Sequence, residues 1–349
     1  MARERRHHRA GRLAAVVASP IMARETAVTR LALTERAAAL LRPRLELLRQ
    51  SRAVDLQIFT YPMDAHVDVD IAFLSRELFV GSTVDHFAPA LDGFFRFLER
   101  QPDLKWLHIS SAGIDFETVE TLLSRNVRVT TSSGTTAEPI AQSALAGILC
   151  LSRGTLRWIQ HQQQGRWAPP PMDQWPRDLR GQTATIIGMG PIGREIARLL
   201  KALGLHVIGV RRNLSDRPPH CDEVRGPDEL AEIARRTDWL VVACPLTEET
   251  RGLVDRRILY ALPRGAGVAN VARGAIVEEP ALIDALSENH LSGAFLDAFT
   301  EEPLPKSSPL WDWRTSSSPR TARRSRPATN TAKPSSSPRT SPCSSTARQ

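Results

Sequence analysis

Three glycines at a fixed spacing carry the clearest chemical signal in the chain. The segment Gly188-Met-Gly190-Pro-Ile-Gly193 follows an apolar, β-type run and opens an amphipathic helical pattern. Such glycines permit a tight turn, close approach of a pyrophosphate and close packing of helix on strand, while the helix N-terminus supplies N–H donors. An ordinary glycine-rich turn is the weaker interpretation. The pattern predicts a dinucleotide site that includes Gly188, Gly190, Pro191, Ile192 and Gly193.

The type of cofactor depends on the residues that follow the second strand, which we expect to end at Val210. An acidic residue there favours NAD, whereas an arginine accommodates the 2′-phosphate of NADP. This chain has Arg211 and Arg212 at that point. We therefore expect NADP(H) to be favoured and NAD(H) to be the second choice, unless the two arginines are merely a solvated surface pair.

Two sets of alternating strand and helix patterns must position this loop. Strands are expected over 54–61, 69–75, 104–111 and 127–133 in the first set. The second set begins at Thr183, with strands over 183–188, 206–210, 239–245, 267–270 and 294–299 and helices such as 195–203 and 280–288. This alternation favours parallel sheets covered on both faces. The predicted class is α/β, with two Rossmann-like or flavodoxin-like parallel-sheet domains and an interdomain cleft.

The expected domain boundaries follow from composition. A basic tail covers 1–24, and a substrate-binding domain covers 25–140 and is completed by 300–313. The NAD(P)-binding domain covers 141–299; an apolar helix over 140–151 and a polar arm over 160–171 form the joint. The 36 residues of 314–349 contain no Val, Ile, Leu, Met, Phe, Trp or Tyr, so we expect this tail to be disordered.

The net charge of +8 belongs to the two ends of the chain. Residues 314–349 contain seven Arg, one Lys and no acid, and the first twelve residues contain five Arg and one Glu. These ends contribute +12, so residues 13–313 carry about −4. A basic surface for specific nucleic-acid binding is therefore not expected on the folded body.

Cysteine spacing and hydropathy exclude other classes. Cys150, Cys221, Cys244 and Cys343 stand far apart without a CxxC pair, so we expect neither a metal site nor a disulfide framework, and a cytoplasmic location. No apolar run reaches the 18 or so residues of a membrane helix, so no membrane partner is expected. The apolar stretch 13–18 is short for a signal peptide, and Met22 is an alternative initiator.

Several ordered motifs resemble the D-isomer-specific 2-hydroxyacid dehydrogenases, particularly the members similar to glyoxylate/hydroxypyruvate reductases. They are DLRGQTATIIGMGPIGREIARLLKALG, CPLTEETRGLVD, NVARGAIVEEPALIDAL and GAFLDAFTEEPLP, within 178–313. The earlier LHISSAGID and TSSGTTAEPIAQSAL look like that family's substrate loop and interdomain region. The resemblance implies two similar α/β domains, a small 2-oxo or 2-hydroxy acid substrate, and a homodimer formed through the cofactor domain.

The resemblance also implies roles for individual residues. Arg273, in NVARGA, matches the arginine that holds the substrate carboxylate and polarises the keto oxygen, and its planar fork suits a 2-oxo acid. Glu302 matches the acidic partner of the catalytic histidine, whose pKa it would raise. Backbone N–H groups around Ser111, Ala112 and Gly113 would receive the substrate carboxylate. The further cofactor residues implied are Pro245, Thr250, Ala272 and Asp297.

The pattern breaks where the family's general-acid histidine should stand. That histidine normally follows PLWDW closely, but here the last histidine is His290, and His108 lies in an expected strand, where a structural role is favoured. Read in the frame that starts at each third codon base, the codons after Trp313 permit Asn, three apolar residues, Ser-Pro and then a histidine at the Arg320–Thr321 step. We interpret the tail as a frameshift; a natural Ser/Arg-rich tail is the alternative.

Two functional hypotheses from different classes follow. The first is NAD(P)-dependent reduction of a 2-oxo acid such as glyoxylate or hydroxypyruvate, impaired by loss of the catalytic histidine. The second is a dinucleotide-binding regulatory protein on the same fold, similar to the C-terminal-binding-protein corepressors. Retention of Arg273 and Glu302 favours the enzyme, whereas the missing histidine favours the regulator.

Overall fold

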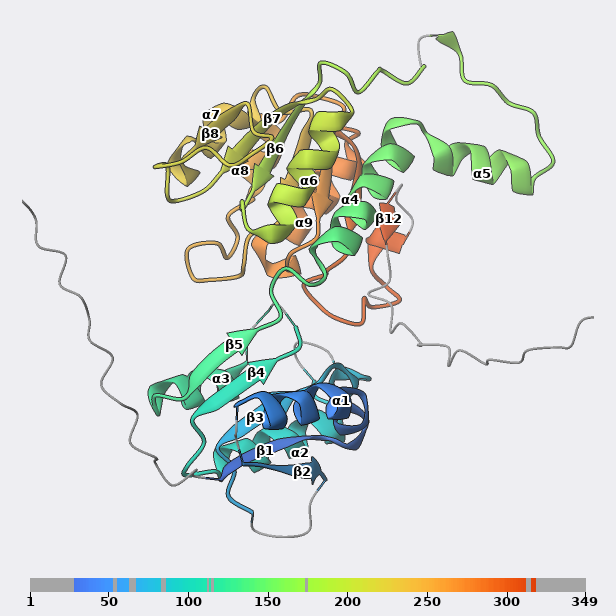
Figure 1. Cartoon of the computed structure of the whole chain (residues 1–349). Helices are drawn as coiled ribbons and strands as arrows, with labels where there is room; N and C mark the ends of the chain where they lie inside the picture. The colour runs from blue at the N-terminus through green and yellow to red at the C-terminus, as the bar shows by residue number, and fades with distance from the viewer. Residues whose placement is uncertain are drawn as a thin grey trace, which may run out of the picture.

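The computed structural model describes residues 28–52, 55–62, 67–82, 86–111, 113, 116–172 and 175–311, and the backbone of 315–317. The described strands form two separate sheets, and every strand pair within them is parallel. Figure 1 shows each sheet with its own helices, and the chain passes from one to the other between β5 and α4. The expected fold class is therefore confirmed. No helix in the described part of the chain is long and apolar enough to cross a membrane.

The first sheet, sheet A, has the strand order β2-β1-β3-β4-β5, which is the flavodoxin-like order. Its strands are β1 (Thr29–Thr34), β2 (Leu56–Tyr61), β3 (Ile71–Leu74), β4 (Trp106–Ile109) and β5 (Arg128–Thr131). The helices of this domain are α1 (Glu35–Arg52), η1 (Arg76–Phe79), α2 (Pro89–Glu99) and α3 (Glu117–Ser124). Four of the strands lie within expected ranges, whereas β1 was not predicted.

The second sheet, sheet B, has the order β12-β11-β10-β9-β6-β7-β8, a Rossmann order extended by one strand. Its strands are β6 (Thr183–Ile187), β7 (His206–Val210), β8 (Glu223–Arg225), β9 (Trp239–Val242), β10 (Ala266–Asn270), β11 (Leu291–Leu296) and β12 (Thr315–Ser317). The helices are α4 (Ala137–Ser152), α5 (Thr155–Gln163), α6 (Pro191–Ala202), η3 (Pro227–Glu229), α7 (Leu230–Ala234), α8 (Arg256–Ala261), η4 (Gly274–Ile276), α9 (Glu279–Ser287) and η5 (Pro309–Trp311).

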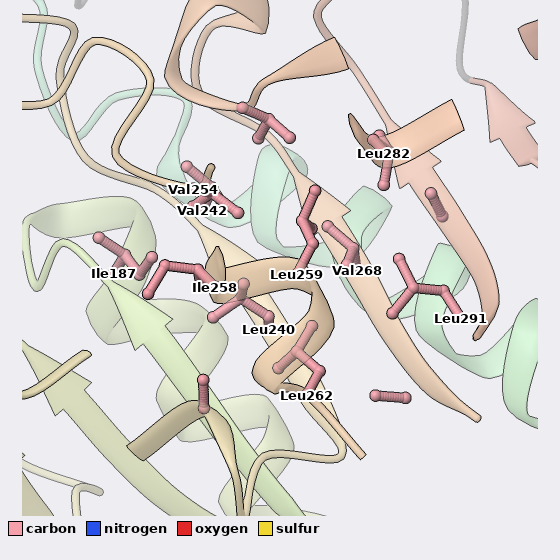
Figure 2. Close-up of a cluster of buried hydrophobic side chains, with 14 of the residues drawn as sticks. Ile187, Leu240, Val242, Val254, Ile258, Leu259, Leu262, Val268, Leu282 and Leu291 are labelled. Atoms are coloured by element: carbon pink, nitrogen blue, oxygen red, sulfur yellow. The ribbon is translucent and has the colours of Figure 1, made fainter. Parts of the chain in front are cut away.

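Aliphatic side chains on both faces of sheet B form the larger core of the molecule. Ile187, Leu240, Val242 and Val268 come from three neighbouring strands and pack with side chains of α8 and α9 (Figure 2). Strands buried on both faces read as continuous apolar runs, as Trp239–Val242 does, because helices cover each side of a parallel sheet. This packed sheet places the ends of β6, β9, β10 and β11 along one carboxyl edge.

Two segments differ from the expected domain boundaries. We expected 300–313 to complete the substrate domain, but Leu304 and Leu310 pack into the core beside sheet B. We also expected disorder from Arg314 onward, whereas Thr315–Ser317 form β12, which pairs with β11 in parallel. The basic tail expected over 1–24, and the rest of the tail expected over 314–349, lie outside the described residues.

Helix α4 packs against sheet B. It packs on α6, and a Cβ at Gly147 would lie 2.3 Å from the Phe295 ring, so only glycine allows the helix to approach β11 this closely. After α4 the chain forms α5 and an irregular segment, which extend away from sheet B (Figure 1). This segment, the arm (residues 155–172 and 175–177), matches the position of the expected polar arm.

A buried carboxylate ties together the amino ends of sheet A. Asp70 is 6% exposed and accepts hydrogen bonds from the Arg30 backbone N–H (2.9 Å), Arg30 Nε (3.0 Å) and Lys105 Nζ (2.8 Å). Burial by itself would raise the pKa of Asp70, but the hydrogen bonds from Arg30 and Lys105 outweigh it and hold the pKa well below its ordinary value of 3.8. The start of β1 is thereby fastened to the segments that lead into β3 and β4.

We predict that Asp70→Asn lowers the free energy of unfolding at pH 7 by about 2–3 kcal/mol, since charge-assisted hydrogen bonds are lost. A carboxylate with a depressed folded-state pKa stabilises the fold above its unfolded pKa and loses this contribution as the pH falls below it. The difference between variant and wild type should therefore shrink below about pH 4. Urea titrations at several pH values measure it.

Asp103→Asn is the matched control. Asp103 contacts the same arginine, Arg30, at 3.3 Å, but its side chain is 57% exposed. Surface ion pairs of this kind contribute at most about 1 kcal/mol. Equal destabilisation by the two variants would contradict the role assigned to Asp70.

Candidate functional site

The three motif glycines lie in the turn between β6 and α6, and each has a separate structural reason. Gly188 has a φ of +97°, and a Cβ there would lie 2.6 Å from the Cys244 backbone at the end of β9. At Gly193 a Cβ would lie 1.9 Å from the Gly188 carbonyl oxygen, so α6 packs on the turn only through a bare backbone. The first and third glycines therefore shape the loop itself.

Gly190 differs from its two neighbours because it faces open space. Its φ of −72° suits any residue, and a Cβ there would meet no heavy atom within 4 Å. It precedes Pro191, the first residue of α6, and Ile192 follows. A ligand can thus approach the backbone at the positive end of the α6 dipole, which is where a dinucleotide fold binds pyrophosphate. The residues present fit such a group.

Arg211 and Arg212 follow β7 at the same edge of the sheet but have different surroundings. The Arg211 side chain is 19% exposed, and its Nη1 lies 3.1 Å from Asp216 Oδ1. Arg212 is exposed. The pKa of Glu249 is lowered, chiefly by a hydrogen bond from the Thr247 hydroxyl and to a smaller degree by the charge of Arg212. The positive charge of Arg212 therefore acts on the loop that follows β9.

That loop contains the two remaining residues implied on this side, Pro245 and Thr250. The Thr250 hydroxyl donates to the Pro245 carbonyl at 2.8 Å and accepts from the Thr247 backbone N–H at 2.7 Å. The loop is thus closed by its own hydrogen bonds. It lies beyond the end of β9, next to the Gly188 turn, because the Ala243 N–H donates to the Ile187 carbonyl at 2.8 Å.

Arg273 stands in the loop that follows β10. It is half-buried, and its Nη1 donates to the Ala272 carbonyl at 3.0 Å. A Cβ at the next residue, Gly274, would lie 1.9 Å from the Phe299 carbonyl carbon, so this loop lies directly on the backbone that follows β11. The Arg273 loop and the Phe299 loop are therefore immediate neighbours.

The loop after β11 carries the two acidic residues implied by the resemblance. The Asp297 N–H donates to the Asn270 carbonyl at 2.9 Å, which places Asp297 at the end of the sheet beside β10. Glu302 folds back so that its Oε1 accepts from the Phe299 N–H at 3.2 Å. The structure thus places Arg273, Asp297 and Glu302 on adjoining loops at one edge of sheet B.

The expected substrate loop follows β4 in sheet A. Ser111 is half-buried, and its hydroxyl donates to the Gly113 carbonyl at 3.0 Å. The Ser132 N–H, at the end of β5, donates to the Ser111 carbonyl at 3.2 Å, so the loop is tied to the start of the interdomain connection. Ala112 lies outside the described residues.

His108 makes the contacts of a structural histidine. Its Nδ1 is 2.8 Å from Thr130 Oγ1 and its Nε2 is 3.1 Å from Ser132 Oγ, both on the neighbouring strand or at its end. Its ring stacks on Phe73 at 5.6 Å. Both ring nitrogens are therefore committed to hydroxyl groups of sheet A.

A hollow of about 490 Å³ lies beside the dinucleotide loop, between the start of α4, the outer face of α6 and His220. Its lining includes Glu138, Arg194 and Arg198. Arg194 also braces the loop, because its Nε donates to the Met189 carbonyl at 3.0 Å. Sequence reasoning assigned no role to Arg194, Asn270 or Ser132, although each of them stands in one of the quoted motifs.

Known proteins share these features. A family model described as "D-isomer specific 2-hydroxyacid dehydrogenase, NAD binding domain" matches residues 145–317. The (S)-sulfolactate dehydrogenase of Chromohalobacter salexigens is 32% identical over 213 residues, covering 61% of this chain and 68% of that protein. The glyoxylate/hydroxypyruvate reductase A of Arabidopsis thaliana is 33% identical over 202 residues, covering 58% of this chain and 63% of that protein.

Solved structures agree with the sequence comparison. The D-isomer specific 2-hydroxyacid dehydrogenase of Xanthobacter autotrophicus Py2, in complex with NADPH and MES, superposes with a TM-score of 0.61 at 28% identity, covering 81% of this chain and 84% of that chain. The Rossmann sheet with its glycine loop is the fold of a dinucleotide-binding protein, and the comparisons place it among nicotinamide-dependent dehydrogenases and reductases. The chain belongs to the D-isomer specific 2-hydroxyacid dehydrogenase family.

We predict that Gly190→Ala weakens NADPH binding by roughly tenfold or more without lowering Tm, because the new methyl group fills space kept for the pyrophosphate but touches no protein atom. Gly193→Ala should instead lower Tm, since its Cβ collides with the Gly188 carbonyl oxygen. NADPH titration by fluorescence and thermal melts measure both effects. Unchanged NADPH affinity in Gly190→Ala would contradict the assignment of the loop.

Proposed function

We propose that this protein reduces a small 2-oxo acid of the glyoxylate or hydroxypyruvate type, with a nicotinamide cofactor as hydride donor. The observation that carries the proposal is the placement of Arg273 on the same sheet edge as the Gly188 turn, with Asp297 and Glu302 on the adjoining loop. The names of the related (S)-sulfolactate dehydrogenase and glyoxylate/hydroxypyruvate reductase A point to acids of this class.

The chain's own residues account for recognition of the acid. The Arg273 guanidinium can pair with the carboxylate through two parallel hydrogen bonds and direct a third donor to the keto oxygen. Backbone N–H groups of the Ser111–Gly113 loop would hold the carboxylate from the side of sheet A. Asp297 would orient the nicotinamide amide, and the bound nicotinamide would supply the hydride to C2 of the acid.

The proton for the C2 oxygen requires a general acid, and the given sequence has no histidine after His290, where the resemblance would place it. We propose that Glu302 pairs with a histidine encoded in the alternative frame after Trp313. The position of β12 supports this interpretation, because the four codons of Thr315–Ser318 permit three apolar residues in that frame if the serines use TCN codons, and apolar residues suit a strand beside the buried β11. A cofactor-binding regulator remains the second candidate, favoured by the lack of a histidine after His290.

NADP(H) is the cofactor we favour over NAD(H). Arg212 is exposed beside the expected ribose position, and Arg211 is held there by Asp216. Guanidinium groups in this place can pair with a 2′-phosphate, whereas no acidic residue follows β7 directly to bind a 2′-hydroxyl.

We predict that the chain as given reduces hydroxypyruvate and glyoxylate about 10²–10⁴-fold more slowly than the product of a gene with its frame restored at Trp313, because a general acid contributes that much to rate. Steady-state oxidation of NADPH measures both proteins. Equal kcat values would contradict the role given to the histidine.

Two controls belong to the same assay. Arg273→Lys in the frame-restored protein keeps the charge but loses the bidentate fork, so kcat/KM should fall for both acids. Replacement of NADPH by NADH should lower kcat/KM. The double change Arg211→Ser, Arg212→Ser should bring the kcat/KM values for NADPH and NADH closer together. Absence of turnover with either acid and either cofactor would favour the regulator.

We also propose that the arm binds a second copy of this chain. Its large apolar side chains are exposed, including Trp167 (96%), Met172 (80%) and Trp175 (63%). Tryptophan and methionine are enriched at protein–protein interfaces relative to the rest of the surface. The arm leaves the cofactor domain directly after α4, which agrees with a homodimer formed through that domain.

We expect the double change Trp167→Ser, Trp175→Ser to convert a dimer into a monomer while the far-UV spectrum stays unchanged. Light scattering coupled to gel filtration measures the mass. Gln162→Ala, an exposed change in the same arm, is the control and should leave the dimer intact. A wild-type monomer, or a dimer that survives the double change, would show that the arm has another role.

A further inference from the structure

We infer that Asn270 is the positioning residue for Arg273, and that it links the arginine to Asp297, which directly follows the neighbouring strand β11. The inference rests on the proposed function, because it concerns how the arginine meets a substrate carboxylate. Asn270 is the last residue of β10 and is 1% exposed. A buried polar side chain requires hydrogen-bond partners, and those of Asn270 lie within the Arg273 loop.

The side-chain amide of Asn270 closes this loop from inside. Its Nδ2 donates to the Arg273 carbonyl at 2.9 Å, and its Oδ1 accepts from the Ala272 N–H at 3.0 Å. One side chain therefore holds the Ala272 N–H, which precedes Arg273, and the carbonyl of Arg273 itself. An uncharged amide supplies the donor and the acceptor on two separate atoms, whereas a hydroxyl has to supply both from one oxygen.

The backbone of Asn270 makes the connection to β11. Its carbonyl accepts from the Asp297 N–H at 2.9 Å, and in the sheet it stands opposite Val242 on one side and Leu296 on the other. Asn270 thus contacts both loops: its side chain bonds to the Arg273 loop, and its carbonyl bonds to the backbone of Asp297. A shift of its side chain would move Arg273 relative to Asp297.

Asn270 acts through Arg273 and not by direct contact with substrate. The cavity that it lines with Gly274, Glu279 and Ala298 has a volume of only about 10 Å³, too small for a 2-oxo acid. On the other side, Gly274 is pinned against Phe299 and Thr300. The Arg273 carbonyl also accepts a longer bond from the Ile276 N–H at 3.3 Å, so the loop keeps one anchor when the amide is removed.

The test is the affinity of the NADPH-saturated chain for oxamate, an unreactive analogue of a 2-oxo acid, measured by calorimetry. We expect Asn270→Ala to weaken oxamate binding by about tenfold, the effect of one lost charge-positioning hydrogen bond, while the Kd for NADPH changes less than about twofold. A merely structural role would weaken both ligands together.

A double-mutant cycle separates positioning from an independent contribution. Arg273→Lys alone should weaken oxamate binding. Asn270→Ala added to Arg273→Lys should reduce the affinity for oxamate by less than about a further twofold, because the residue through which Asn270 acts is already changed. Additive losses would overturn the inference. Thr185→Val is the matched control, because it removes a buried hydrogen bond elsewhere in sheet B. This bond joins the hydroxyl of Thr185 in β6 to the hydroxyl of Thr237 at 2.6 Å. The change should lower Tm without altering the affinity for oxamate.

The remaining outcomes are also decisive. If Arg273→Lys binds oxamate as the wild type does, or the wild type does not bind oxamate at all, the proposed function fails and the inference fails with it. If Arg273→Lys weakens binding but Asn270→Ala does not, only the inference fails. Should Asn270→Ala not fold, Asn270→Ser replaces it in the same cycle, and loss of oxamate and NADPH affinity by one common factor would overturn the inference.

Discussion

The contact between the Gly274 backbone and the Phe299–Thr300 backbone is the constraint on which the site depends. No side chain can stand between these loops, since a Cβ on Gly274 would overlap the Phe299 carbonyl. The loop after β10 and the loop after β11 are therefore held at van der Waals distance. The loops that carry Arg273 and Glu302, which lie 29 positions apart in the sequence, adjoin each other through this contact.

The parallel sheet supplies the remaining geometry. Strand order reverses between β6 and β9, and ligands of open α/β sheets bind beyond the carboxyl ends at such a point. Gly188 fills the narrow space against Cys244 there, and Gly190 leaves space open next to it. The same edge carries the Arg273 loop two strands away from β6. A cofactor bound along this edge would run from the Arg212 side toward Arg273.

Local patterns in the sequence predicted much of this arrangement. The alternation of apolar runs and helices located four strands of sheet A and five of sheet B, and the glycine spacing located the turn before α6. β1 was missed because its residues, Thr29–Thr34, run directly into the Ala- and Leu-rich α1 and share its composition. Thr315–Ser317 were missed because nothing apolar marks them; they form a strand only beside β11.

Side-chain roles that depend on how a loop folds back on its own residues could not be predicted in this way. Asn270 is an ordinary polar residue in the sequence, and its importance is visible only when its amide is seen bonded to Ala272 and Arg273. Arg194 likewise follows the glycine motif without any signal that its guanidinium braces Met189. Arg273 and Glu302 were recognised by resemblance, because neither lies in a local pattern that demands a charge.

The most direct measurement is a crystal structure of the complex with NADPH and oxamate. The account predicts that the Arg273 guanidinium turns from the Ala272 carbonyl to the oxamate carboxylate, with the NADPH pyrophosphate against Gly190 and the nicotinamide beside Asp297. Oxamate bound elsewhere, with Arg273 still on Ala272, would contradict it.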